Sequence, residues 1–88
     1  MTNPTENKEL TREEILKAAL YGREQEIMHY QINIDNYTIA LEEIGKLPLS
    51  EQVELKDFSE QLRNLLASEI LEQKKAKIML SVLKAQVG

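Results

Sequence analysis

Glu26 and His29, in the stretch EIMH, stand at the spacing of metal ligands on a helix. Di-metal four-helix bundles use a Glu and a His three residues apart on one helix, together with a Glu from each neighbouring helix. Glu69 or Glu72 from the second half of the chain could supply the remaining carboxylates if two copies combined. A ferritin-like, metal-binding helical hairpin is therefore one alternative hypothesis.

The pattern around these two residues argues against such a centre. On a wheel of about 100° per residue, Glu26 and His29 fall to one side of the apolar stripe, and Ile27 and Ile34 hold the inward positions. A lone Glu-x-x-His is also a weak signal. We therefore expect His29 to lie at the rim of a helix contact, with no bound metal and no cofactor.

The rest of the sequence offers no catalytic set. It contains one His and no Cys, so it has neither a thiolate nucleophile nor a Cys-based zinc site. It also lacks a Gly-rich phosphate loop and the spacing of a Ser-His-Asp triad. We expect a protein that is not an enzyme.

The composition is that of a small helical protein. Of 88 residues, 30% are charged and 5% are aromatic, and three Gly and two Pro leave few turn residues for a sheet. No apolar run approaches the roughly 18 residues that cross a bilayer, and the N-terminus lacks the pattern of a secretory signal. We expect one all-α domain in the cytoplasm, without membrane contact.

The charge argues against nucleic acid as the partner. The net charge is -4, which disfavours contact with a phosphate backbone. Lys74, Lys75 and Lys77 could form a basic patch, although lysines also suit the C-terminal end of a helix dipole. A nucleic-acid-associated regulator remains a second alternative hypothesis.

The first helix is predicted over about 12–44. Thr11 followed by Glu14 forms a capping box, and a flexible tail over 1–10 precedes it. Gly22 lies inside this helix, where we expect it to mark close packing against a neighbouring helix.

An elbow and a second helix follow. Gly45 and Pro48 end the first helix, and a loop over 45–50 leads to a helix over about 51–86. A connection this short favours an antiparallel helical hairpin.

Both helices carry an apolar stripe with the spacing of a coiled coil. The first helix contributes Leu16, Leu20, Ile27, Tyr30, Ile34, Tyr37, Leu41 and Ile44, interrupted only by Arg23. The second contributes Leu55, Phe58, Leu62, Leu65, Ala76, Leu80, Leu83 and Val87, interrupted at Glu69 and Gln73 and widened by Leu66 and Ile70. These stripes form the predicted seam of the hairpin.

The polar interruptions are predicted to meet. Folding the chain about Leu47 brings Arg23 within a turn of Glu69 and Gln73. We expect a contact between Arg23 and one of these two residues inside the seam. Its role would be to fix the register of the helices.

A second apolar stripe lies roughly opposite the first. Its residues are Tyr21, Met28, Ile32 and Ile39 on the first helix and, more weakly, Val53, Leu71, Ile78, Met79 and Val82 on the second. A helix with two apolar sides needs neighbours on both, and a two-helix hairpin has only one internal interface. We expect a homodimer that forms a four-helix bundle.

One face of the first helix carries neutral polar residues, namely Gln25, His29, Asn33 and Asn36. Such a face is typical of a contact with another protein. We expect a non-enzymatic protein-protein interaction module, a small dimeric regulator, inhibitor or adaptor that binds a partner protein.

Overall fold

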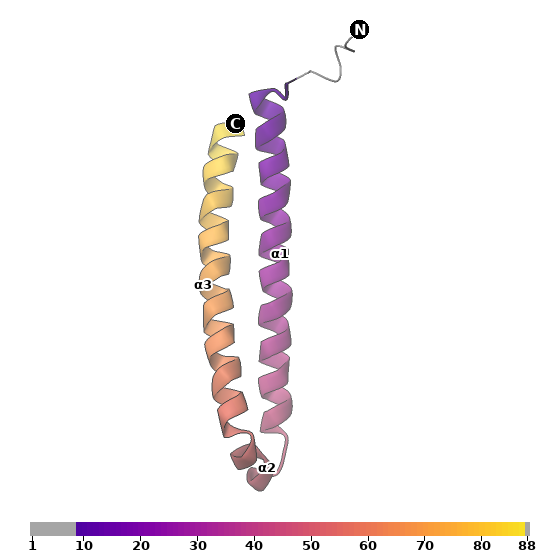
Figure 1. Cartoon of the computed structure of the whole chain (residues 1–88), viewed down its shortest axis with the longest axis vertical. Coiled ribbons are helices and arrows are strands. Elements are labelled where there is room, and N and C mark those ends of the chain that lie inside the picture. Colours follow the sequence, from indigo (N-terminus) through magenta and orange to yellow (C-terminus); the bar gives the residue numbers. More distant parts are fainter. Residues whose placement is uncertain (1–8, 88) are drawn as a thin grey trace.

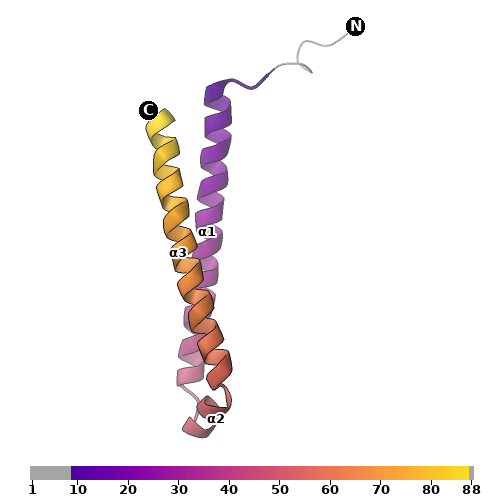
Figure 2. The same cartoon turned by 60° about the vertical axis from the view of Figure 1, so that its left-hand side comes forward.

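The computed structural model of the chain describes residues 9–87 and is a hairpin of helices. α1 spans Arg12–Gly45, α2 spans Leu49–Glu54 and α3 spans Lys56–Val87. Figure 1 shows α1 and α3 side by side and antiparallel, with α2 at the turn, and Figure 2 shows that the long helices cross at a shallow angle. The predicted all-α helical hairpin is confirmed.

Part of the predicted N-terminal tail, residues 1–8, lies outside the described residues. Over the described range, 9–87, none of the helices has the length and apolar character to cross a membrane.

α1 begins at the predicted cap. Thr11 has extended backbone, and its Oγ1 accepts a hydrogen bond from the Glu14 N–H at 3.1 Å. The same hydroxyl donates to Glu14 Oε1 at 3.1 Å. The cap satisfies one of the N–H groups that a helix start leaves without a partner. From there the helix continues to Gly45, close to the predicted end at residue 44.

Gly22 does not mark close packing, contrary to the prediction. A Cβ built at this position would meet no atom within 4 Å, and the residue is exposed. Its place on the helix is turned away from α3, so a larger residue would fit there as well.

The second half of the hairpin is not one helix over 51–86, as predicted. Helical structure already starts at Leu49, and it is broken at Leu55, whose φ and ψ are -98° and 13°. The reversal of the chain therefore extends over residues 46–55 instead of a loop over 45–50. Local signals such as Pro48 mark the start of this turn, but the break at Leu55 carries no Gly or Pro.

Gln52 ties the short helix α2 to the end of α1. Its Nε2 donates to the carbonyl oxygen of Leu47 at 2.7 Å and to that of Gly45 at 3.3 Å. Carbonyl groups at the C-terminal end of a helix have no backbone N–H of a following turn to accept from. The side-chain amide of Gln52 donates to these carbonyls instead.

The surface between α1 and α3 confirms the predicted stripe on α1 and corrects the one on α3. On α1, all eight apolar residues of the predicted stripe are half-buried. On α3, Phe58, Leu65 and Val87 were expected to face α1, but they are 47%, 40% and 37% exposed. The buried residues of α3 are Ser59, Leu62, Gln73 and Ala76.

The α3 residues that face α1 follow the heptad spacing without interruption. They are Ser59, Leu62, Leu66, Glu69, Gln73, Ala76, Leu80 and Leu83. The prediction placed Phe58 and Leu65 in the seam because they are apolar, whereas a strict alternation of three and four residues counted back from Ala76 passes through Ser59 and Leu66.

The register of the two helices differs from the prediction. Hydrogen bonds across the contact join Asn33 to Glu69, Gln31 to Gln73, and Arg12 to Gln86. The residue numbers in these pairs add to between 98 and 104, whereas a fold about Leu47 predicts about 94. The longer reversal, which includes α2, accounts for the difference.

Candidate interaction surfaces

Arg23 does not make the predicted contact across the seam. Its Nη1 donates to Glu26 Oε1, on the same helix, at 3.1 Å. Because the reversal is longer than expected, Glu69 and Gln73 lie opposite a later part of α1, near Asn33 and not near Arg23. The predicted Arg23–Glu69 and Arg23–Gln73 contacts are therefore wrong.

Gln73 and Glu69 contact α1 through other partners. Gln73, 7% exposed, donates through Nε2 to Gln31 Oε1 at 3.0 Å and to the Ile27 carbonyl at 3.3 Å. Asn33 Nδ2 donates to Glu69 Oε1 at 3.3 Å, and Glu69 Oε2 is buried with no hydrogen-bond partner among residues 9–87. These polar contacts favour one alignment of the helices, since a shift by one turn would leave buried groups without partners.

Tyr30 lies beside this polar part of the seam. The loss of water around its phenol raises its pKa above the ordinary value of 10.0, and the carboxylates of Glu26, Glu72 and Glu69 raise it further, while Arg23 lowers it. The folded chain therefore holds the phenol protonated to a higher pH than an exposed tyrosine. The same three carboxylates make this flank of the hairpin acidic.

The suggested metal ligands do not form a centre within one copy of the chain. His29 is exposed, and Glu26 is paired with Arg23. Within residues 9–87, no three His, Cys, Asp or Glu side chains are grouped so that they could hold a metal ion. The hypothesis built on Glu26, His29, Glu69 and Glu72 thus requires a second copy to complete the ligand set.

α1 carries four apolar residues on the face turned away from α3, and we call them the α1 stripe. Tyr21 is 66% exposed, Met28 57%, and Ile32 and Ile39 52% each. At about 100° per residue they lie roughly opposite the half-buried seam residues. Over residues 9–87, the hairpin leaves more than half of each of these side chains uncovered.

α3 carries a corresponding set on its own outer side, the α3 stripe. Leu71 is 53% exposed, Ile78 64%, Val82 45% and Met79, at the edge of the stripe, 42%. Each stripe faces away from the other helix, so the α1 stripe and the α3 stripe point in nearly opposite directions. These eight residues, predicted as an interface, are thus exposed, on two separate faces.

The predicted neutral polar face is divided by the structure. Gln25, His29 and Asn36 are exposed, but Asn33 is half-buried and donates to Glu69 on α3. Asn33 therefore belongs to the contact between the helices, and three residues of the face remain available.

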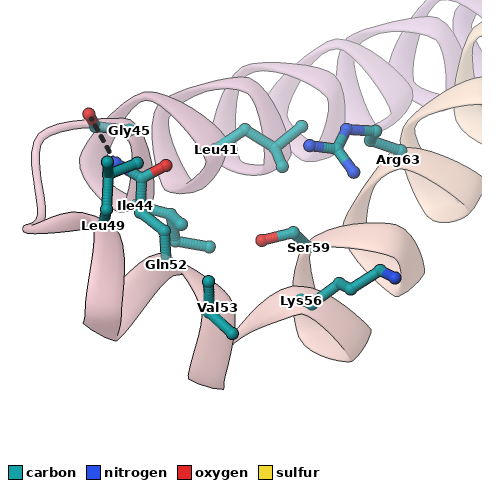
Figure 3. Close-up of a pocket in the computed structure, with 9 residues that line it drawn as sticks. All are labelled: Leu41, Ile44, Gly45, Leu49, Gln52, Val53, Lys56, Ser59 and Arg63. Carbon is teal, nitrogen blue, oxygen red and sulfur yellow. Dashed lines mark hydrogen bonds between the residues drawn. The ribbon is translucent and has the colours of Figure 1, made fainter.

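The elbow forms a pocket that the sequence analysis did not find. It has a volume of about 350 Å³ and lies between the end of α1, the whole of α2 and the start of α3 (Figure 3). Its apolar lining is Leu41, Ile44, Leu49 and Val53, with the cationic side chains of Lys56 and Arg63 beside it. A signal was present, because Leu47 and Leu49 flank Pro48 at a turn, where exposed apolar residues are unusual.

The three lysines of the nucleic-acid hypothesis are exposed on α3. Lys75 pairs with Glu72 at 3.1 Å. Lys75 and Lys77 are two residues apart on a helix and therefore point to nearly opposite sides of α3. The three do not share one face.

Comparison of the chain with protein-family models, with curated proteins and with solved structures found no match.

Proposed function

We propose that the chain is a non-enzymatic protein-protein interaction module, a small helical regulator, inhibitor or adaptor that self-associates and binds a partner protein. The observation that carries this proposal is the pair of uncovered apolar stripes on the outer sides of α1 and α3. Single exposed apolar residues are ordinary, but a set repeated at helical spacing on both long helices is typical of a surface that another protein covers.

The C-terminal half of α3 is the surface that we assign to the partner protein. Ile78, Met79 and Val82 lie within little more than one helical turn and are all exposed. Apolar residues at this spacing are the anchors by which a helix enters a groove on another protein. Exposed Lys74 and Lys75 lie one helical turn before Ile78, on either side of the stripe. The partner that fits is therefore an apolar groove with an acidic rim.

The test is capture of partner proteins from cells of the source organism by the tagged full chain and by two variants. Ile78→Gln/Val82→Gln alters the α3 stripe, and Leu49→Gln/Val53→Gln is the control, since it makes the same kind of change at two apolar residues of the elbow that are even more exposed, at 78% and 72%. Surface changes of this kind leave stability within about 0.5 kcal/mol, and circular dichroism verifies the helices.

The proposal expects a protein that the unaltered chain and the elbow variant retain and the α3 variant loses. Retention of the same proteins by all three would contradict the assignment of the α3 stripe. Capture of nothing by the unaltered chain, from cells that express it, would contradict the proposed function.

A further inference from the structure

Building on the proposed function, we infer that the α1 stripe packs against the α1 stripe of a second copy, antiparallel, around a two-fold axis level with Tyr30. The inferred partner of this face is thus the chain itself, and the register of the pair is defined. The α3 stripe is left free for another protein.

Along the outer face of α1, apolar and polar residues follow one another in nearly the same order from either end of the helix. Its heptad positions are Glu14, Ala18, Tyr21, Gln25, Met28, Ile32, Asp35, Ile39, Glu42 and Lys46. In an antiparallel pair whose two-fold axis lies at residue 30, a residue of one helix faces the residue of the other helix whose number, added to its own, gives 60. The four residues of the α1 stripe then meet one another, as a self-complementary two-fold interface requires, while Ala18 meets Glu42 of the second copy beyond the end of the stripe.

The central layers of this pair are apolar. Tyr21 meets Ile39 of the second copy, and Met28 meets Ile32 of the second copy; the two-fold axis repeats both contacts. All four residues are more than half exposed in the single hairpin, so each has surface to bury. Tyrosine and methionine are also among the residue types enriched in protein interfaces.

The polar position within the stripe is matched as well. Asp35 meets Gln25 of the second copy, whose amide N–H can donate to the carboxylate. Within one copy, Asp35 Oδ1 already accepts from Gln31 Nε2 at 2.9 Å, which leaves Oδ2 for the amide across the interface. A carboxylate that accepts two N–H groups in this way is a satisfied group, not a buried unpaired charge.

The ends of the stripe are complementary in charge. Glu14 meets Lys46 of the second copy, and the two-fold axis places one such pair at each end. Both residues are exposed, and their contacts within one copy, Glu14 with Thr11 and Lys46 with Glu43 at 2.9 Å, are short-range surface contacts. Charge pairs at the ends of helix contacts select partner and orientation more than they add affinity.

Other arrangements of two α1 helices oppose like groups. A parallel pair in register sets Asp35 against Asp35 and Glu14 against Glu14. An antiparallel pair shifted by one heptad sets Ile32 against Asp35 in one direction and Ile39 against Glu14 in the other, so that a carboxylate lies against an isoleucine in each. The register centred on residue 30 avoids both.

The other faces of the hairpin are less suited to self-pairing. A two-fold pairing of the α3 stripe that matches Leu71 with Val82 sets Lys75 against Ile78. Stacking of two hairpins through the flank of Tyr30 would cover the carboxylates of Glu26 and Glu72 that surround this phenol. It would also leave both stripes exposed. The inferred dimer instead sets four helices in a row, in the order α3, α1, α1, α3.

Cysteine pairing tests the orientation and the register, because the chain has no cysteine of its own. Tyr21→Cys and Ile39→Cys are prepared as full-length single variants, and each is oxidised alone and in an equal mixture. Residues 21 and 39 of one helix are about 27 Å apart, whereas a disulfide needs Cα atoms within about 7 Å. The mixture is expected to form a covalent dimer of one Tyr21→Cys and one Ile39→Cys chain, and each variant alone is expected to stay unlinked.

A second measurement keeps the test decisive if a cysteine weakens the contact. Sedimentation equilibrium of the purified chain is expected to show a dimer, and Met28→Glu/Ile32→Glu is expected to raise its dissociation constant about tenfold or more. Leu71→Glu/Ile78→Glu, the matched change on the α3 stripe, is expected to leave the dimer unchanged, and circular dichroism verifies the hairpin in each variant.

Efficient linkage of either cysteine variant alone, a dimer that only the α3 variant disrupts, or a chain that stays monomeric would each overturn the inference. A monomeric chain would also contradict the self-association in the proposed function, but none of these results bears on partner capture by the α3 stripe, which the capture experiment tests separately.

Discussion

Gln73 is the residue through which the two long helices contact each other most specifically. Its amide is buried, and it donates both to a side chain and to a backbone carbonyl of α1. An apolar seam alone tolerates a shift of one helix by a heptad, because leucine can replace leucine in each layer. A buried amide does not tolerate the shift, since its partners exist at one place only.

Replacement of Gln73 by alanine should therefore destabilise the hairpin. The substitution Gln73→Ala removes the two hydrogen bonds and opens a small space in the seam, and we expect a loss of about 1–3 kcal/mol in the free energy of unfolding. Urea unfolding followed by circular dichroism measures it. The matched control is Gln61→Ala, the same change at an exposed position of α3, which should cost less than about 0.5 kcal/mol. Equal losses for the two variants would show that the amide of Gln73 contributes nothing specific.

At the scale of the elements, α1 is a long helix with few buried contacts to stabilise it. Over Arg12–Gly45 it has no fully buried residue, although one side of it contacts α3 along its length. Its stability therefore depends on the cap at Thr11, on helix propensity and on the half-buried seam. A residue with low helix propensity that makes no packing contact therefore lowers the stability of α1.

Gly22 is such a residue. Because a Cβ at this position meets no atom within 4 Å, Gly22→Ala should stabilise the hairpin by about 1 kcal/mol through the lower conformational freedom of alanine in the unfolded chain. Thermal unfolding of the variant measures the gain. Gly45→Ala, at the last residue of the same helix, is the control and should give a smaller increase, since a terminal residue is less constrained. A loss of stability at residue 22 would show that another molecule covers this position.

At the scale of the whole molecule, the hairpin has one interface and a small core. The only buried apolar residues among those described are Leu62 and Ala76. A single seam in a chain of this size gives marginal stability. A second copy on the α1 stripe would add an interface of similar length, and folding and association would then be linked.

That linkage predicts a melting temperature that depends on protein concentration. For the unaltered chain, each tenfold increase in concentration should raise the midpoint of thermal unfolding by about 2–5 °C, because association stabilises the folded form by mass action. Met28→Glu/Ile32→Glu, which alters the α1 stripe only, should have a lower midpoint that changes less with concentration. A constant midpoint for both chains would show that the folded hairpin does not associate over the range measured.

Much of the fold could be predicted because its causes are local. Thr11 and Glu14 form a cap within one turn of each other, and Gly45 and Pro48 end a helix through their own backbone preferences. The apolar spacing along α1 predicted which side of that helix faces α3, because a helix repeats every 3.6 residues whatever its neighbour is. The exposed α1 and α3 stripes were predicted in the same way.

The details of the contact depended on the two helices together. Phe58 and Ser59 compete for one place in the seam, and the structure buries Ser59 there and leaves Phe58 47% exposed. The break at Leu55 has no local cause in the sequence, but it adds length to the reversal, and that length moves Gln73 from Arg23 to Gln31. Patterns of a few residues thus specify which helices form and which sides are apolar. The register between the two helices is determined by many small contacts between residues far apart in the sequence. These contacts exist only when both helices are packed against each other.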